Sequence, residues 1–385
     1  MDSSTWAAAP VKPPRQGRRA AFTAATALCA AVGLGACSSS SSSSSAPSTG
    51  STGSATASAA GQAVGVALIL KTLSNPYFVS MEKDAQTAAA KDNVSLTVAA
   101  GTSDGDTQTQ ISAIDNAIAR GDKGILITTN GDAVNAALNQ ARKAGLFVIA
   151  LDTAPNPAST ADITYATDNT QAGRLDGQYA AAMLGGKPAV IAMLDLFNNQ
   201  VVSVDIDRDH GFLEGMGINP GSATQNGQEA KTGSYNGGGK YTIACHQPTT
   251  GAIDGGRTAM ENCLSANPNI NVVYAINEPA AEGAYEAIKA AGKLNQIKIF
   301  AIDGSCAGLK LVTSGEFTAD AVQYPGKMAS LGVDSIAQLA RGGSKPSVTS
   351  GKSFFDTGTA LVATKAYPGV TIESPAAGAS ACWGS

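Results

Sequence analysis

The hydrophobic pattern of the chain repeats one unit, a short apolar run followed by an amphipathic stretch. The first unit spans residues 64–84, where VGVALIL is an unbroken apolar run of strand length and KTLSNPYF is a polar loop. Phe78, Met81 and Ala85 then recur at helical spacing. The unit predicts a strand, a loop and a helix of an open parallel sheet, in which ligands bind beyond the carboxyl ends of the strands.

The same alternation continues along the chain, which is long enough for two domains. It predicts a parallel, doubly wound α/β fold, with a second sheet that starts near residue 189. Residues 220–240, rich in Gly, Asn and Ser, are assigned only to surface decoration. The expected strands are 64–70, 95–99, 124–129, 146–151, 189–194, 271–276, 297–302, 317–322 and 359–363, with helices that include 170–184, 254–266 and 280–291.

Polar side chains follow several of these strands within one to five residues. They are mainly amides and carboxylates, which match vicinal hydroxyls, whereas a phosphate site would need a glycine-rich loop or clustered Arg and Lys. Tyr77 and Phe78 offer flat faces for the C–H face of a sugar. Asn75 also fits a plain helix start, and the two aromatics also fit core packing. The residues are Asn75, Thr129, Asn130, Asp152, Asn277, Asp303 and Gln323.

The first 36 residues are typical of an export signal. Four basic residues precede an apolar run over 20–36 that is short for a membrane span, and Leu34-Gly35-Ala36-Cys37 resembles a bacterial lipobox. The lipobox implies cleavage before Cys37 and a lipid on its thiol, which would hold the protein on the outer face of the cytoplasmic membrane. An ordinary signal peptide and a lone transmembrane helix are the alternatives. Residues 37–61, rich in Ser and Gly, predict a disordered tether.

The charge balance favours a small uncharged ligand. The net charge is −4, and residues 1–36 contain four basic and one acidic side chain, so the mature chain carries about −7. No basic segment follows the leader, so no nucleic acid partner is expected. The only histidines, His210 and His246, are not spaced as metal ligands, and we expect no metal or cofactor.

Four cysteines remain after Cys29 in the leader and Cys37. An even number in an exported chain favours two disulfides, which can pair in three ways. We expect Cys245–Cys263, which are close in the chain, and Cys306–Cys382, which would staple the tail. Buried free thiols are the alternative.

Six segments in order and spacing resemble the periplasmic sugar-binding proteins of ABC importers, in the ribose- and fructose-binding branch. The resemblance covers about residues 64–362, and the stretch NNQVVSVDIDRDHGFLEGM with INEPAAEGAY most resembles fructose-binding members. The six segments are LILKTLSNPYFVSMEKDA, ILITTNGDAV, VIALDTAP, VVYAINEPAAEGA, IFAIDG and ADAVQYPGKMASLGV.

This resemblance implies two similar lobes joined by three hinge crossings, near 167–168, 323–324 and 356–357, with a monosaccharide held between them. The expected lobes are residues 62–167 plus 324–356 and residues 168–323 plus 357–385. The expected sugar-binding residues are Lys71, Asn75, Tyr77, Phe78, Asn130 and Asp152 from the first lobe, and Arg208, Asn277, Asp303 and Gln323 from the second lobe or the hinge.

Several positions depart from the ribose-binding pattern. Lys71 replaces a small polar residue, Thr153 replaces an arginine, and Ile302 replaces an aromatic residue. Residues 245–254 are rearranged, so the usual aromatic of the second lobe cannot be placed. These departures argue against ribose. The resemblance favours D-fructose, with ribose, xylose, galactose and inositol as alternatives.

The implied activity is capture of the sugar by a monomer and delivery to an ABC permease. Asp152 and Asp303 also suggest the carboxylate pair of a glycosidase. However, no nucleophile with an adjacent base is present, so we expect no enzyme. A repressor is excluded because no helix-turn-helix segment precedes Val64 and the chain is exported. A ligand presenter to a chemotaxis or sensor receptor would use the same cleft and differ only in its partner.

Overall fold

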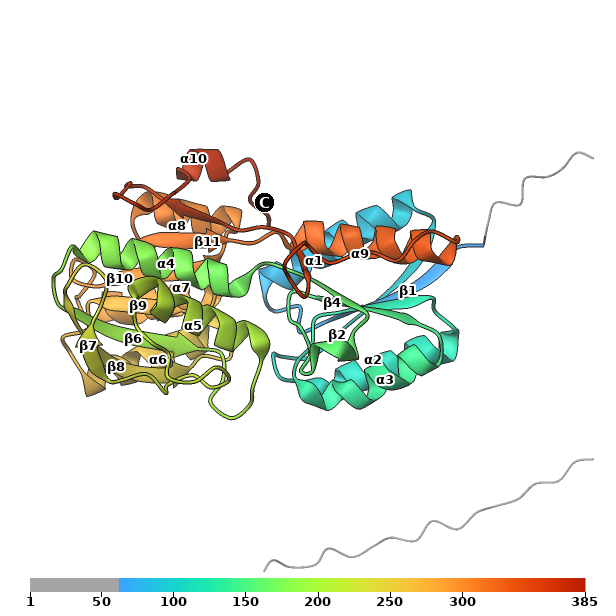
Figure 1. The fold of residues 1–385 in the computed structure, drawn as a ribbon, viewed down its shortest axis with the longest axis horizontal. Helices are drawn as coiled ribbons and strands as arrows, with labels where there is room; N and C mark the ends of the chain where they lie inside the picture. Colours follow the sequence, from blue (N-terminus) through green and yellow to red (C-terminus); the bar gives the residue numbers. More distant parts are fainter. Residues whose placement is uncertain (1–61, 385) are drawn as a thin grey trace, which may run out of the picture. The chain divides into compact units, whose positions relative to one another are not determined.

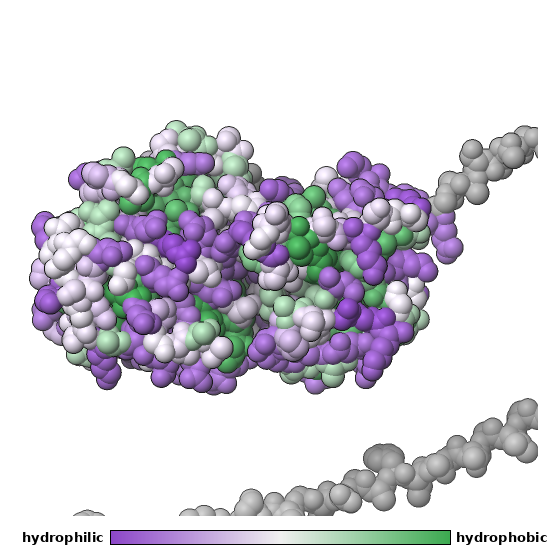
Figure 2. Space-filling model, viewed as in Figure 1, coloured by the Kyte–Doolittle hydropathy of each residue, from purple (hydrophilic) through white to green (hydrophobic). Residues whose placement is uncertain are grey.

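The computed structural model describes residues 62–384. The predicted leader (1–36), the tether (37–61) and the lipidation site Cys37 lie outside the described residues. Within them, no helix combines the length and the apolar character that crossing a membrane requires. On the face drawn in Figure 2, hydrophobic residues form small separated areas among hydrophilic ones.

The first sheet has six parallel strands in the order β12-β5-β4-β3-β1-β2. Helices α1 (Pro76–Lys91) and α9 (Pro325–Ala340) cover one face, and α2 (Thr107–Arg120) and α3 (Asn135–Lys143) cover the other (Figure 1). We call this unit the N-lobe. Its strands are β1 (Val64–Leu70), β2 (Val94–Ala100), β3 (Gly124–Ile127), β4 (Phe147–Leu151), β5 (Ile163–Ala166) and β12 (Phe355–Asp356).

The second sheet has seven strands in the order β13-β11-β10-β9-β6-β8-β7, and we call it and its helices the C-lobe. Its central strands are parallel, while β7 and β13 pair antiparallel at the two edges. The strands are β6 (Ala189–Asp195), β7 (Thr232–Ser234), β8 (Lys240–Pro248), β9 (Val272–Ala275), β10 (Lys298–Asp303), β11 (Ala319–Val322) and β13 (Ala360–Ala363).

Helices α4 (Asn169–Leu184) and α5 (Ser203–Met216) cover one face of this sheet. Helices α6 (Ile253–Ala266), α7 (Glu278–Ala290) and α8 (Cys306–Ser314) cover the other, and the short α10 (Pro375–Gly378) packs on α8. The chain passes between the two sheets three times, between β5 and α4, between β11 and α9, and between β12 and β13.

The α/β fold with mostly parallel sheets confirms the predicted fold class. The assignment of residues 220–240 to decoration is wrong in part, because β7 lies there as an edge strand. Strands β5, β8 and β12 were not predicted from the sequence either. Strand β8 mixes polar and apolar residues because it lies next to the edge strand β7 and most of its residues are only partly buried.

Alternate residues of a strand point to opposite faces of the sheet, and β1 shows how this builds the core. Val66, Leu68 and Leu70 belong to the cluster that α1 and α9 cover, while Ala67 and Ile69 belong to the cluster that α2 and α3 cover. An unbroken apolar run is therefore what a strand buried on both faces requires. The carboxyl end of β1 is thereby fixed in the interior, at the start of the loop to α1.

Both predicted disulfides form. Cys245 in β8 joins Cys263 in α6, and Cys306 in α8 joins Cys382 in the tail. The two disulfides close loops of 18 and 76 residues, and in the chain-entropy account they stabilise the fold by about 3 and 4.5 kcal/mol.

Candidate functional site

A small cavity of about 30 Å³ is lined by residues from both lobes. Its wall combines aromatic, charged, amide and aliphatic side chains, and eight of the ten predicted binding residues belong to it. Asn75 and Asn130 do not. The lining residues are Lys71, Tyr77, Phe78, Asp104, Asp152, Leu196, Val204, Arg208, Ile276, Asn277, Asp303 and Gln323.

The aromatic part of the wall comes from the first turn of α1. Asn75 caps this helix, because its side-chain oxygen accepts a hydrogen bond from the Tyr77 backbone N–H at 2.9 Å, and Pro76 occupies the first helical position. The rings of Tyr77 and Phe78 meet edge to face with centroids 5.3 Å apart. The sequence Asn-Pro-Tyr-Phe thus fixes two adjacent rings, both almost fully buried, at the tip of β1.

Asp152 follows β4 and is held in an unusual backbone conformation. Its φ is 63°, and the Thr153 N–H bonds to the Leu151 carbonyl at 2.6 Å, which closes a γ-turn around it. Its carboxylate accepts hydrogen bonds from Tyr77 Oη at 3.1 Å and Thr153 Oγ1 at 2.7 Å. Non-glycine residues in such conformations are uncommon and concentrate at functional sites.

Arg208 in α5 reaches carboxylates of both lobes. Its guanidinium lies 3.7 Å from Asp152 and 3.9 Å from Asp303. Nε donates to Asn169 Oδ1 and Nη1 to the Ile276 carbonyl, each at 2.8 Å. Helix α5 packs closely on α4 because Gly173 has no side chain. A Cβ at this position would lie 2.1 Å from the Arg208 carbonyl oxygen. Packing and hydrogen bonds therefore fix this charge between the two carboxylates.

Asp303 ends β10 and lies fully inside the protein. Its Oδ1 accepts from Gln323 Nε2 at 2.8 Å, and its Oδ2 accepts from the Glu278 N–H at 3.3 Å. Burial raises the pKa of Asp303 above its ordinary range, while the Arg208 charge opposes that rise. Burial also raises the pKa of Tyr77, with the Asp152 and Asp303 charges adding to it. The Tyr77 phenol therefore stays protonated and acts as a hydrogen-bond donor.

The three predicted asparagines use much of their bonding capacity within the protein. Asn75 caps α1, and Asn277 caps α7 by accepting from the Ala280 N–H at 3.0 Å. Asn277 also donates to the Gly251 carbonyl at 3.1 Å and still lines the cavity. Asn130 donates to backbone carbonyls of Lys71 and Asp106, which holds the loop after β2. Contact between Asn130 and a ligand stays a prediction, and these hydrogen bonds do not favour it.

Comparison with known proteins decides the family. Residues 66–344 match the family described as "Periplasmic binding protein domain". The chain belongs to this family. This binding protein is 28% identical to the ribose import binding protein of Escherichia coli, over 72% of this chain and 85% of that protein. It is 25% identical to the D-allose-binding periplasmic protein of the same species, over 74% and 88%. Its family consists of solute-binding proteins rather than enzymes.

Solved structures share the fold of this binding protein. An ABC transporter solute-binding protein from Actinobacillus succinogenes with bound D-allose has a TM-score of 0.65, at 24% identity over 78% of this chain and 97% of that one. The myo-inositol-binding protein of Caulobacter has a TM-score of 0.66, at 22% identity over 78% and 93%. At these identities the likeness establishes the fold alone.

A second positive charge beside Asp152 comes from Lys71 rather than from position 153. Thr153, which replaces an arginine of the ribose-binding pattern, bonds to Asp152 instead. The Lys71 ammonium lies 3.8 Å from Asp152 and 5.9 Å from the centroid of the Phe78 ring. Lys71 thus places a cation beside Oδ2 of Asp152, while Arg208 lies beside Oδ1 of the same carboxylate. Ile302 does not replace the missing aromatic, because it packs into the core beneath α4 and α5.

Four lining residues were not predicted. Leu196, Val204 and Ile276 give the C-lobe an aliphatic wall. Asp104 lies four residues beyond β2, so the rule of polar residues after strands would have found it. Burial raises the pKa of Asp104, and Lys71 opposes the rise. The aliphatic residues carry no sequence signal that distinguishes them from core residues.

His246 in β8 lies in an acidic cluster that does not line the cavity. Within residues 62–384, Asp195, Asp209 and His246 form the one group whose ligand atoms lie close enough to hold a metal ion. However, His246 Nδ1 bonds to Asp195 at 2.7 Å and Nε2 to Glu229 at 2.9 Å. Burial opposes protonation, but these two bonds raise the pKa of His246 to about 11. The imidazolium is therefore itself the cation of this cluster, and Glu229 ties residues 220–231 to the sheet.

Proposed function

We propose that this binding protein captures one neutral monosaccharide or polyol between its lobes and delivers it to an ABC permease. The observation that carries the proposal is the convergence of two rings, three carboxylates, a lysine, an arginine and two amides from both lobes on one cavity. Carboxylates and amides match hydroxyl groups, and rings match the C–H face of a sugar. The relatives named for ribose and D-allose support the same ligand class.

Capture requires the lobes to separate and close again. The cavity of about 30 Å³ is far too small for a sugar, because ligand pockets start near 300 Å³. A larger cavity of about 740 Å³ lies next to the small one, between the lobes. Its lining includes Asp104 and Asp303, which also line the small cavity, and Glu278. A sugar would enter through this outer cavity. Because it contacts both lobes only when they are closed, it would shift the population toward the closed form.

D-fructose is the specific ligand that the sequence resemblance favours. Lys71 near Asp152 and Thr153 in place of an arginine both depart from the ribose-binding pattern, which supports a ligand other than ribose. Ribose, allose, xylose, galactose and myo-inositol are the alternatives. Two cations, Lys71 and Arg208, and three carboxylates line the cavity, so it offers no excess of positive charge to an anionic ligand.

A thermal-shift screen of the full chain with these six compounds tests the proposal. We expect one of them, at a hundredfold excess over its dissociation constant, to stabilise the protein by about 2.7 kcal/mol. Glucose 6-phosphate serves as the charged control and should have no effect. If none of the six neutral compounds raises the melting temperature, the proposed ligand class is wrong.

The protein is proposed to work outside the cytoplasm as a monomer, anchored through a lipid on Cys37. The anchor rests on the lipobox-like sequence Leu34–Cys37. A Cys37→Ser variant of the full chain should appear in the medium instead of the membrane fraction, as judged by immunoblotting. A variant that still sediments with membranes would contradict the lipid assignment.

A further inference from the structure

The C-terminal tail returns to the candidate site and is fixed to the C-lobe. Cys382 forms a disulfide with Cys306 at the start of α8. The next residue, Trp383, forms a parallel bridge with Ser305, and its carbonyl accepts a hydrogen bond from the Cys306 N–H at 2.9 Å. A covalent bond and backbone bonds thus hold Trp383 in place. The match to the family ends at residue 344, so the tail lies beyond it.

The side chain of Trp383 touches candidate ligand residues of both lobes. Its indole N–H donates to the Asp303 carbonyl at 3.0 Å, in the C-lobe. Its ring meets the Tyr77 ring of the N-lobe edge to face, with centroids 5.3 Å apart at 84°. Only 8% of the residue is exposed, and it packs in the hydrophobic cluster of the N-lobe. One side chain therefore links the two lobes by contacting Tyr77 and Asp303, which both line the small cavity.

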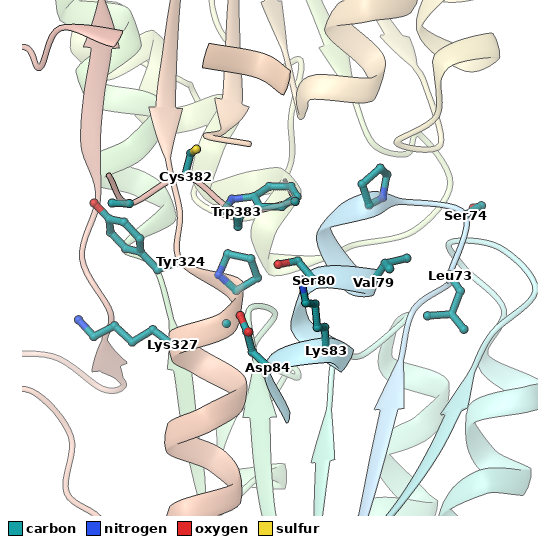
Figure 3. A pocket seen from close by; sticks show the side chains of 15 residues that line it. Leu73, Ser74, Val79, Ser80, Lys83, Asp84, Tyr324, Lys327, Cys382 and Trp383 are labelled. Atoms are coloured by element: carbon teal, nitrogen blue, oxygen red, sulfur yellow. The ribbon is translucent and has the colours of Figure 1, made fainter. Parts of the chain in front are cut away.

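Trp383 lines two larger cavities but not the small inner one. It lines the outer cavity between the lobes and a second cavity of about 750 Å³ between α1, α9 and the tail. Figure 3 shows Trp383 with Cys382 on one side and Ser80 of α1 on the other. Because the backbone of Trp383 belongs to the C-lobe and its ring packs on the N-lobe, separating the lobes would expose the ring.

We propose that Trp383 is a positioning residue that latches the closed form and orients Tyr77 toward the ligand. This proposal rests on the proposed function. For a ligand that binds only the closed form, the apparent dissociation constant equals the dissociation constant of the closed form divided by the fraction of protein that is closed. Loss of the indole lowers that fraction and thus weakens binding, although Trp383 does not line the inner cavity. The disulfide to Cys306 keeps the latch attached to the C-lobe.

Calorimetry with the stabilising compound from the thermal-shift screen tests the latch. Trp383→Ala should weaken binding by about tenfold, since an edge-to-face ring pair and a hydrogen bond each change an equilibrium constant by about tenfold or less. Trp383→Phe keeps a ring but loses the N–H donor, and should restore part of the affinity. Cys382→Ser should weaken binding in the same direction, whereas Cys245→Ser, which breaks the other disulfide, should leave affinity unchanged.

Tryptophan fluorescence separates a latch from a merely structural residue. The chain has two tryptophans, Trp6 and Trp383, so in a Trp6→Phe variant of the full chain the emission reports on Trp383 alone. Its emission should change on ligand addition and saturate at the concentration that calorimetry gives. Unchanged emission, together with unchanged affinity in Trp383→Ala, would overturn the proposal even if that variant melts at a lower temperature.

A measurement without ligand keeps the latch testable if the proposed function fails. Small-angle X-ray scattering of the full chain should give a larger radius of gyration for Trp383→Ala and Cys382→Ser than for wild type and Cys245→Ser. Equal radii in all four proteins would refute the latch. Failure of all six compounds to bind wild type would refute the proposed function and leave this scattering result to decide the latch by itself.

Discussion

The two walls of the cavity are built in different ways. The N-lobe wall comes mainly from one local segment, in which Lys71, Tyr77 and Phe78 lie within eight residues of one another. The C-lobe wall is assembled from the ends of β6, β9 and β10 and from α5. Its charges are held by neighbours from other elements, as Asn169 in α4 holds Arg208.

This difference indicates that the two lobes contribute different groups to ligand binding. The N-lobe offers two rings on a capped helix, suited to one face of a ligand, and Asp152 in a strained turn. Both lobes supply buried charges, but the C-lobe adds an aliphatic wall, and hydrogen bonds from other elements hold its Arg208 and Asp303. Arg208 and Gln323 link the walls, because Arg208 faces Asp152 and Gln323 lies 3.4 Å from the Tyr77 hydroxyl. We therefore expect changes in the C-lobe network to cost more than changes in the N-lobe.

The largest effect is expected from Arg208→Met, which leaves Asp152 and Asp303 without their shared cation. Removing one partner of a buried ion pair costs about 3–5 kcal/mol. Ligand affinity by calorimetry and the midpoint of chemical unfolding should both fall, affinity by at least a hundredfold. Arg174→Met is the matched control, because Arg174 forms an exposed pair with Glu214 worth about 0–1 kcal/mol. Equal effects of the two substitutions would contradict the account.

A smaller effect is expected from Lys71→Met in the N-lobe. Methionine keeps the contact with Phe78 but removes the cation near Asp152, which still faces Arg208. Affinity should fall by about tenfold, or about 1.4 kcal/mol, with little change in unfolding midpoint. Lys83→Met, on the exposed side of α1, should bind like wild type. If Lys71→Met also binds like wild type, Lys71 does not contribute to the site.

The smallest effect on ligand affinity is expected from His246, which does not line the cavity and contributes to stability and its pH dependence. His246 faces Asp195, Asp209 and Glu229, and its pKa rises to about 11 from an unfolded value near 6.5. Its stabilising contribution is therefore complete below pH 6.5 and is lost as the pH rises toward 11. In denaturant titrations at pH 6, His246→Gln should have a lower free energy of unfolding than wild type. This gap in the free energy of unfolding should narrow at pH 10. A gap that is constant across this range would argue against a protonated His246.

The N-lobe wall could be predicted largely from sequence because its determinants are local. The run VGVALIL, the cap Asn75 and the helical spacing after it fix the place of Tyr77 and Phe78 without reference to the rest of the chain. Arg208 followed only from the family resemblance. Leu196 and Val204 could not be distinguished from core residues, because their role depends on how the lobes meet.

Trp383 shows the same limit more clearly. The cysteine pairing predicted that the tail would be stapled, and it is. Nothing in the local sequence Ala381–Trp383 indicates that the indole reaches across to Tyr77. The edge strand β7 was missed for a related reason, because three residues gain strand structure only by pairing with β8.

The central claim is that both lobes bind one ligand, and calorimetric titration of two matched variants tests it most directly. Asp152→Asn changes the N-lobe wall and Asp303→Asn the C-lobe wall, each with minimal change in shape. Both should weaken binding of the same sugar or polyol by at least tenfold, because each leaves buried hydroxyl or arginine donors with a weaker acceptor. Wild-type affinity in either variant would contradict the claim that the ligand is held between the lobes.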